Sequence, residues 1–364
     1  MSKVQTCKLN RQTGTSQQKQ RRLIRVAAKP SDLFRGETPS RWQLYRDGVS
    51  ASFLGCFLRC REQTRLMYVE GWSQMTEPFY FRFGSTFHYL LEKAYGRSNQ
   101  HKLPPQTWIK KLFAKYYRDW VGSEHRSERA CEDMALSIEL ATMAFKGYKR
   151  VWVDDWAKKK ARGKSPVQWL ALEKFFKVKH RLPNGHTISV IGYRDGVFID
   201  RDNRIWIIDT KCLSRFSVSD IMESLPFDMQ LMLYAATARS EFGNPYGCIL
   251  NIVKRPQLYR RKDESTIDYL QRVEESLEGK NADEKNFYRI PMEFTPKEID
   301  EWVDRVLNPI LLDVEAWWLG KSPHYLNSTA LVNQYGKCSM FDPIVRGDFS
   351  LLKQRPFKKG TRHG

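Results

Sequence analysis

The sequence predicts an α/β (α+β) protein in which helices flank a central mixed sheet and a helical layer precedes it. Two patterns lead to this fold class. Apolar residues recur at helical spacing from about residue 50 to 153, and short alternating or apolar runs typical of strands begin near residue 172. The chain has 364 residues, 41% of them hydrophobic and 13% aromatic, which is enough for a substantial core and disfavours a disordered protein.

Apolar periodicity and end signals predict the helices. The apolar positions are Phe53, Cys56, Phe57 and Cys60 in the first helix, Phe87, Leu90, Leu91 and Ala94 in the second, and Met134, Ile138, Ala141, Phe145 and Tyr148 in the third. A further helix is expected over about Ser219–Ala238. The last long helix begins with a capping box of Thr295 and Glu298, and Pro309 is expected to kink it.

Strands and turns alternate in the middle of the chain. Strands are predicted at Leu172–His180, Thr187–Ile191, Gly196–Ile199, Ile205–Ile208 and Cys248–Val253, with turns at Leu182–Gly185 and Asp202-Asn203. Four segments result: a basic flexible arm (1–40), a helical N-terminal part (41–165) that ends in a charged linker at 158–166, a strand-rich core (166–345) and a basic tail (346–364).

The charge balance predicts a polyanionic partner. There are 61 Lys and Arg residues against 41 Asp and Glu, a net charge of +20, and nucleic acid is the commonest partner of such proteins. The excess can also lie in the tails alone: residues 1–36 carry +8 and residues 345–364 carry +5, which leaves +7 for the body.

Several classes of protein are disfavoured. No apolar run approaches the ~18 residues of a membrane span, so no membrane partner is expected. The basic N-terminus has no apolar stretch behind it, as a secretory signal would. Seven scattered cysteines are an odd number, which argues against a disulfide scaffold and for a reducing, cytoplasmic setting.

Two carboxylates and a lysine are the strongest candidates for chemistry. Asp195 and Asp209 lie on adjacent predicted strands joined by a hairpin turn, and Lys211 shares a strand face with Asp209. Paired carboxylates repel unless a cation lies between them, and oxygen ligands suit Mg²⁺ or Mn²⁺. With a lysine beside the metal, this set fits phosphodiester hydrolysis. Two surface aspartates and a solvated lysine would give the same pattern.

Two pairs of polar residues lie on predicted helices. His88 and Glu92 are four residues apart and share one helical face, and the imidazole of His88 is a nitrogen ligand that would favour Mn²⁺. Gln230 and Tyr234 are also four apart and can donate hydrogen bonds to a phosphate. A core histidine and an ordinary sheet-packing helix are the alternatives.

A basic aromatic stretch follows the strand at Cys248–Val253. It contains Lys254, Arg255, Tyr259, Arg260 and Arg261. Such a stretch suits stacking on bases and contact with phosphates, and it equally suits a solvated loop.

The order of these motifs resembles the PD-(D/E)XK nuclease superfamily, and within it the RecB-like branch that includes phage exonucleases. The order is Gly84-x-x-x-His88, Gly192-x-x-Asp195, Asp209-x-Lys211 and Gln230-x-x-x-Tyr234, within a resemblance over roughly residues 50–345. It implies a restriction-endonuclease-like core with residues 166–345 as its catalytic part.

The resemblance also implies roles for single residues. His88, Asp195, Asp209 and the Thr210 carbonyl would bind one or two Mg²⁺ or Mn²⁺ ions. Lys211 would position the attacking water or stabilise the scissile phosphate, while Gln230 and Tyr234 would hold DNA or support the site. Glu173 matches a glutamate often found on the first strand of the family, and it is a weaker candidate together with Glu92.

Two features depart from the family pattern. Arg194 replaces the proline that usually precedes the first aspartate. Many RecB-like members bind an iron–sulfur cluster through four cysteines, but here only Cys56, Cys60 and Cys338 have fitting positions, so no cluster is predicted.

The expected function is a Mg²⁺- or Mn²⁺-dependent deoxyribonuclease. Most consistent with the resemblance is an exonuclease that degrades DNA from its ends in recombination, repair or DNA degradation, in a bacterial or phage-infected cell. The sequence contains no P-loop, so a helicase or a recombination or single-strand-annealing protein is an expected partner besides DNA. The alternatives are an endonuclease with the same site and an inactive nucleic-acid-binding protein with a nuclease fold.

Overall fold

The computed structural model describes residues 41–75, 79–98, 102–123, 126–156, 167–214, 216–255, 260–279, 281–333 and 336–355. The expected arm at 1–40, the linker at 158–166 and the end of the expected tail lie outside these ranges. The described residues form two compact units. The larger unit comprises Gly48–Ser52 and Thr76–Pro309, and the smaller one comprises the described parts of Met1–Asp47, Phe53–Met75 and Ile310–Gly364.

A five-stranded mixed sheet forms the centre of the larger unit. Its strands are β2 (Gln168–Arg181), β3 (Thr187–Ile199), β4 (Ile205–Leu213), β5 (Gly247–Lys254) and β6 (Phe287–Glu293), and they follow one another in this order across the sheet. Only β4 and β5 are parallel; the other neighbours are antiparallel. The predicted fold class, an α/β core with a mixed sheet, is confirmed.

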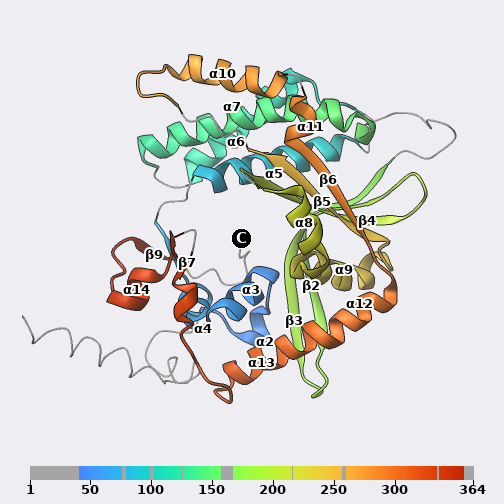
Figure 1. Ribbon diagram of the computed structural model, residues 1–364, viewed down its shortest axis with the longest axis vertical. Helices are drawn as coiled ribbons and strands as arrows, with labels where there is room; N and C mark the ends of the chain where they lie inside the picture. The colour runs from blue at the N-terminus through green and yellow to red at the C-terminus, as the bar shows by residue number, and fades with distance from the viewer. Residues whose placement is uncertain are drawn as a thin grey trace, which may run out of the picture. The chain divides into compact units, whose positions relative to one another are not determined.

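Helices cover this sheet. Figure 1 shows α5 (Phe79–Ser98), α6 (Gln106–Ser123), α7 (Glu128–Val151) and α10 (Thr266–Glu278) gathered along one side of β4–β6, and α9 (Met229–Phe242) and α12 (Pro296–Trp302) on the opposite side. The short helices of this unit are α8 (Val218–Ser224) and α11 (Ala282–Asn286). The predicted helices through Phe87 and Phe145 therefore exist as α5 and α7.

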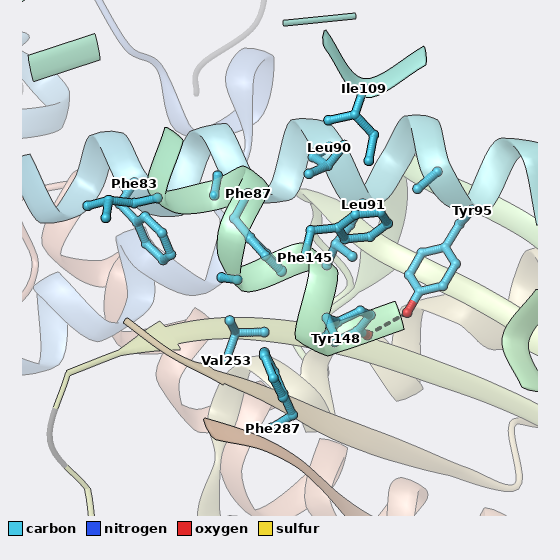
Figure 2. Packing of buried hydrophobic residues seen from close by; sticks show 14 of the residues in the cluster. Phe83, Phe87, Leu90, Leu91, Tyr95, Ile109, Phe145, Tyr148, Val253 and Phe287 are labelled. Carbon is cyan, nitrogen blue, oxygen red and sulfur yellow. Dashed lines mark hydrogen bonds between the residues drawn. The ribbon is translucent and has the colours of Figure 1, made fainter. Parts of the chain in front are cut away.

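Aromatic residues fill the space between the helices α5 and α7 and the sheet. Figure 2 shows Phe87 of α5 beside Phe145 and Tyr148 of α7, with Val253 and Phe287 reaching up from β5 and β6. The ring of Phe87 lies edge-on to Tyr148, with centroids 5.8 Å apart. Edge-to-face pairs of buried rings add to the free energy gained from area burial alone. This cluster fixes α5, the helix that carries His88, against the sheet.

The smaller unit has its own core and its own sheet. It contains α2 (Leu44–Asp47), most of α3 (Ala51–Arg59), α4 (Arg61–Thr64), β1 (Trp72–Gln74), most of α13 (Asn308–Trp318), β7 (Val332–Asn333), β8 (Gly336–Lys337), α14 (Phe341–Arg346) and β9 (Leu352–Gln354). Strand β9 pairs antiparallel with β1, and Leu66, Met340 and Leu352 pack together beneath. The start of the predicted basic tail (346–364) is thus part of this unit as far as Gln354, because β9 pairs with β1 and Leu352 is buried.

Three other expectations need correction. The two strand segments at Thr187–Ile191 and Gly196–Ile199 are one continuous strand, β3. The single helix expected over Ser219–Ala238 is two helices, because Leu225–Phe227 forms a 3-10 turn around Pro226, whose nitrogen carries no hydrogen for a helical bond. The irregularity expected at Pro309 takes the form of a π-helical turn at Val303–Leu307, directly before α13. Among the described residues, no helix combines the length and hydropathy that a membrane span needs.

We expect Phe87→Ala to lower the free energy of unfolding by about 3–5 kcal/mol, since the fully buried ring leaves a cavity in the centre of the α5–α7 core. Urea unfolding followed by circular dichroism measures this change.

The matched control is Phe81→Ala on the same helix. The Phe81 side chain is 55% exposed, so its loss should change the unfolding free energy by no more than about 0.5 kcal/mol. Equal effects of the two substitutions would contradict the packing described for α5.

Candidate metal centre

Asp195 and Asp209 lie where the central sheet splits. Strands β3 and β4 are paired from Ile199↔Ile205 to Gly196↔Ile208, and their pairing stops there. The next residues on the two strands are Asp195 and Asp209. The predicted hairpin, with Asn203 in the left-handed conformation at its turn, therefore brings the two carboxylates side by side.

A third carboxylate occupies the same row of the sheet. On the other side of β3, Leu172 is opposite Gly196 and Lys174 is opposite Arg194, which places Glu173 of β2 opposite Asp195. Side chains opposite one another on neighbouring strands project to the same face. The row across β2, β3 and β4 is therefore Glu173, Asp195 and Asp209.

Helix α5 adds an imidazole to this row. The Nδ1 atom of His88 lies 3.2 Å from Oε1 of Glu173 and 3.4 Å from Oδ2 of Asp195. One ligand atom from each of these three residues lies within 4.8 Å of the others. His88, the predicted nitrogen ligand, therefore lies next to both Asp195 and the weaker candidate Glu173.

The backbone at Glu173 is unusual for a strand. Its φ angle is +43°, in the left-handed region that residues with a side chain rarely adopt. Such a conformation costs of order 1–3 kcal/mol and persists only where the surroundings enforce it, most often at functional sites. Here the strained residue is the one whose carboxylate contacts His88.

Lys211 and Gln230 surround the other carboxylate. The Nζ atom of Lys211 forms an ion pair with Oδ2 of Asp209 (2.8 Å) and donates a hydrogen bond to Oε1 of Gln230, also 2.8 Å away. The side-chain amide of Gln230 donates to Oδ1 of Asp209 (3.1 Å) and to the hydroxyl of Tyr234 (2.8 Å). The predicted Asp-x-Lys and Gln-x-x-x-Tyr residues therefore form one connected group.

Local sequence explains why α9 brings Gln230 to this point. Asp228 caps the helix by accepting a hydrogen bond from the amide of Leu231 (2.9 Å). Gly192 leaves room for the ring of Phe176 on β2, because a Cβ atom there would lie 2.8 Å from that ring, and the Phe176 ring lies edge-on to Tyr234 of α9 with centroids 5.9 Å apart. Arg194 is fully buried and donates to the hydroxyl of Thr237 on α9 (3.0 Å). The residue that replaces the family's proline thus ties β3 to α9.

A buried network behind the row was not anticipated from the sequence. The amide of Thr210 donates to Oδ2 of Asp195 (2.6 Å), and the hydroxyl of Thr210 accepts from the side chain of Asn251 on β5 (3.0 Å). Asn251 in turn accepts from the Tyr148 hydroxyl (3.2 Å).

The network ends at an ion pair. Arg289 of β6 donates to the Tyr148 hydroxyl (3.0 Å) and pairs with Asp155 at 2.5 Å. The signal available in the sequence was Asn251 itself, a lone polar residue inside the apolar run Cys248–Val253.

Electrostatics of the group depends on burial and on neighbouring charge. Burial and the nearby charge of Asp195 raise the pKa of Asp209 to about 7, although Lys211 and His88 oppose the shift. Burial would lower the pKa of His88, but the charge of Asp195 and the hydrogen bond to Glu173 raise it to about 9. Burial likewise acts to lower the pKa of Lys211, and its pairing with Asp209 raises it instead.

Other predicted site residues lie apart from this group. Glu92 pairs with Lys93 at 2.6 Å. Arg255 donates its backbone amide to Leu213 and places its guanidinium 5.9 Å from the ring centroid of Tyr80. Lys254 ends β5, Arg260 and Arg261 bond to Glu264, and Tyr259 lies outside the described residues.

The donor set fits a hard divalent cation. Three carboxylates in one row repel one another, and a single lysine and one imidazole do not satisfy all their oxygens. Carboxylate oxygens and a histidine nitrogen are ligands for Mg²⁺ or Mn²⁺. The raised pKa values of Asp209 and His88 show that added positive charge is favourable here, and either a proton or a metal cation can supply it.

Comparison with protein-family models gives one match. The model of the PD-(D/E)XK nuclease superfamily matches residues 48–312, well over half of the chain. The chain belongs to the PD-(D/E)XK nuclease superfamily. No curated protein matches the chain in a sequence search. The family match confirms the predicted superfamily and its restriction-endonuclease-like fold, and the family consists of nucleases that depend on divalent metals. Assignment to the RecB-like branch stays a prediction.

Affinity for Mn²⁺ should rise by roughly tenfold or more from pH 6 to pH 8, because the cation must displace protons from Asp209, with its pKa of about 7, and from His88, with its pKa of about 9. Both groups hold protons more tightly in the folded chain than in the unfolded chain. The metal-free protein therefore loses stability as the pH rises through these values, and the cation restores it.

Isothermal titration in two buffers of different ionisation enthalpy measures the affinity and the protons released. Asp209→Asn should flatten the pH dependence between pH 6 and 8, whereas the exposed control Asp263→Asn should leave it unchanged. Tight Mn²⁺ binding without proton release at pH 6 would contradict this electrostatic picture.

Proposed function

We propose that this protein is a Mg²⁺- or Mn²⁺-dependent deoxyribonuclease that hydrolyses phosphodiester bonds from DNA ends. The observation that carries the proposal is the row of Glu173, Asp195 and Asp209 beside Lys211 in a chain of this superfamily. The net charge of +20 supports a nucleic-acid substrate. The preference for ends rests on the RecB-like order of motifs, with His88 before the row and Gln230 after it.

In this proposal the carboxylates and the imidazole hold the cation. Glu173, Asp195, Asp209 and His88 would supply side-chain ligands, and the carbonyl of Thr210 would be a further ligand. A bound divalent cation supplies Lewis-acid stabilisation of charge on the phosphate and makes water a nucleophile at neutral pH.

Lys211 acts on the phosphate as a fixed positive charge. Its raised pKa keeps the amine protonated, so it stabilises the negative charge that develops on the phosphate oxygens during hydrolysis. Gln230 positions this ammonium group, because its carbonyl oxygen accepts one of the lysine's hydrogen bonds while its amide is held by Asp209 and Tyr234. A group held in place before the reaction loses little free energy to reorganisation in the transition state.

Removing the lysine charge should abolish most of the activity. We expect Lys211→Met and Asp209→Asn each to lower kcat by roughly 100-fold or more, since each removes a group aimed at the scissile phosphate or its cation. The control Asp263→Asn, which changes an exposed carboxylate, should cleave at the wild-type rate.

The assay uses end-labelled linear DNA and covalently closed circular DNA of the same sequence, with Mg²⁺, Mn²⁺ or EDTA. Loss of the linear form alone supports attack from ends, and cleavage of the circle identifies an endonuclease with the same site. Wild-type cleavage by Lys211→Met, or no metal-dependent cleavage by the wild-type protein, would overturn the proposal.

A further inference from the structure

Strand β2 continues away from the candidate metal centre along the edge of the sheet. It is first in the strand order, and its outer side pairs with no other strand in the part of the chain that the structure describes. Figure 1 shows β2 and β3 running side by side as one long ribbon, and they are paired from Leu172↔Gly196 out to Arg181↔Thr187. The ribbon therefore presents an open edge that begins at Glu173.

The two faces of β2 differ in burial. On one face Phe176 is buried, and its ring lies 5.9 Å from that of Tyr234 on α9. The exposed face carries the alternate residues Phe175, Lys177, Lys179 and Arg181. Glu173 lies on this same alternation, so the exposed residues continue the line that starts in the row of carboxylates.

Every charge on the exposed face beyond Glu173 is positive. The charged residues there are Lys177, Lys179 and Arg181. Directly opposite the three cations of the exposed face, β3 presents Ile191, Ser189 and Thr187, none of which is acidic. Alternate residues of a strand are about 7 Å apart, a step comparable with the spacing of phosphates along an extended nucleic-acid strand.

An aromatic pair lies between the cations and the carboxylates. Phe175 is 45% exposed, and its ring centroid lies 5.3 Å from that of Tyr193, the residue opposite it on β3. The two rings are tilted by 56° and lie side by side on neighbouring strands, and an exposed ring packed beside another ring is a surface on which an unpaired base can stack. A base inside a duplex cannot offer its face in this way.

We propose that the exposed face of β2 is a track for one separated DNA strand, with a base stacked on Phe175 and successive phosphates on Lys177, Lys179 and Arg181. The track leads from Glu173 for about 27 Å to Arg181, long enough for several nucleotides. It rests on the proposed function and makes it more specific: the substrate reaches the site as a single strand. Lysines on an edge strand also prevent the sheets of two molecules from pairing edge to edge. If that were their only role, replacing them would not change DNA binding.

Binding without cleavage tests the track. Fluorescence anisotropy of a labelled 12-nucleotide single strand is measured in EDTA at several salt concentrations. The variant Lys177→Gln/Lys179→Gln/Arg181→Gln should bind roughly tenfold or more weakly and show a salt slope smaller by about 2, as expected when three phosphate contacts are lost. The matched control Lys110→Gln/Lys111→Gln/Lys115→Gln removes three exposed charges from α6 and should leave the slope unchanged.

The stacking part of the track has its own readout. Phe175→Ala should weaken binding of the single strand by roughly tenfold and leave binding of a blunt duplex of the same length unchanged. Equal losses in the two triple variants, or equal effects of Phe175→Ala on both DNAs, would overturn the track. These binding measurements contain no metal, so they remain informative if the proposed nuclease activity is not found. If the β2 triple variant keeps the wild-type salt slope while the wild-type protein cleaves DNA, the track is wrong and the proposed function stands.

Discussion

The arrangement of side chains around the metal centre in the larger unit depends on the repulsion among Glu173, Asp195 and Asp209. Burial and the charge of Glu173 raise the pKa of Asp195, and burial and the charge of Asp195 raise the pKa of Asp209. The fold assembles this row only by adding opposing charges and hydrogen bonds around it. His88 approaches from α5, Lys211 from the same strand as Asp209, and the amide of Thr210 from the backbone. A divalent cation bound here would relieve the remaining repulsion, which would connect the stability of the site to its chemistry.

Packing on both sides of the sheet supports this arrangement. On one side the Phe87–Phe145–Tyr148 cluster fixes the helix that carries His88, and on the other Arg194 ties β3 to the helix that carries Gln230. Between the two, Thr210, Asn251 and Arg289 occupy one row across β4, β5 and β6. Through the hydroxyl of Tyr148 on α7, their hydrogen bonds join Asp195 to the buried Arg289–Asp155 pair, so the oxygen of Asp195 that faces Thr210 is held by contacts that reach β6.

Much of the fold and the site could be predicted from local sequence signals. The apolar periodicity around Phe145, the turn at Asp202-Asn203 and the capping box at Thr295 each depend on neighbouring residues, and each is present in the structure. The meeting of Asp195 with Asp209 followed from the hairpin, which is also a local feature.

What could not be predicted depends on contacts distant in sequence. The ordering of Leu352 arises from pairing with β1, some 280 residues earlier. Glu173 was a weak candidate because its importance depends on register with β3 and on a strained backbone, neither of which a strand pattern reveals. Asn251 gave only a faint signal, since its partners Thr210 and Tyr148 come from two other elements.

The proline that divides α8 from α9 has a further consequence. Helix α8 buries none of its residues, whereas α9 buries seven, including Leu231 and Leu233. Segments with few buried contacts open locally at a small fraction of the global unfolding free energy. Between Lys211 and Gln230 we therefore expect α8 to open locally at a lower free energy than α9, the helix that holds Gln230.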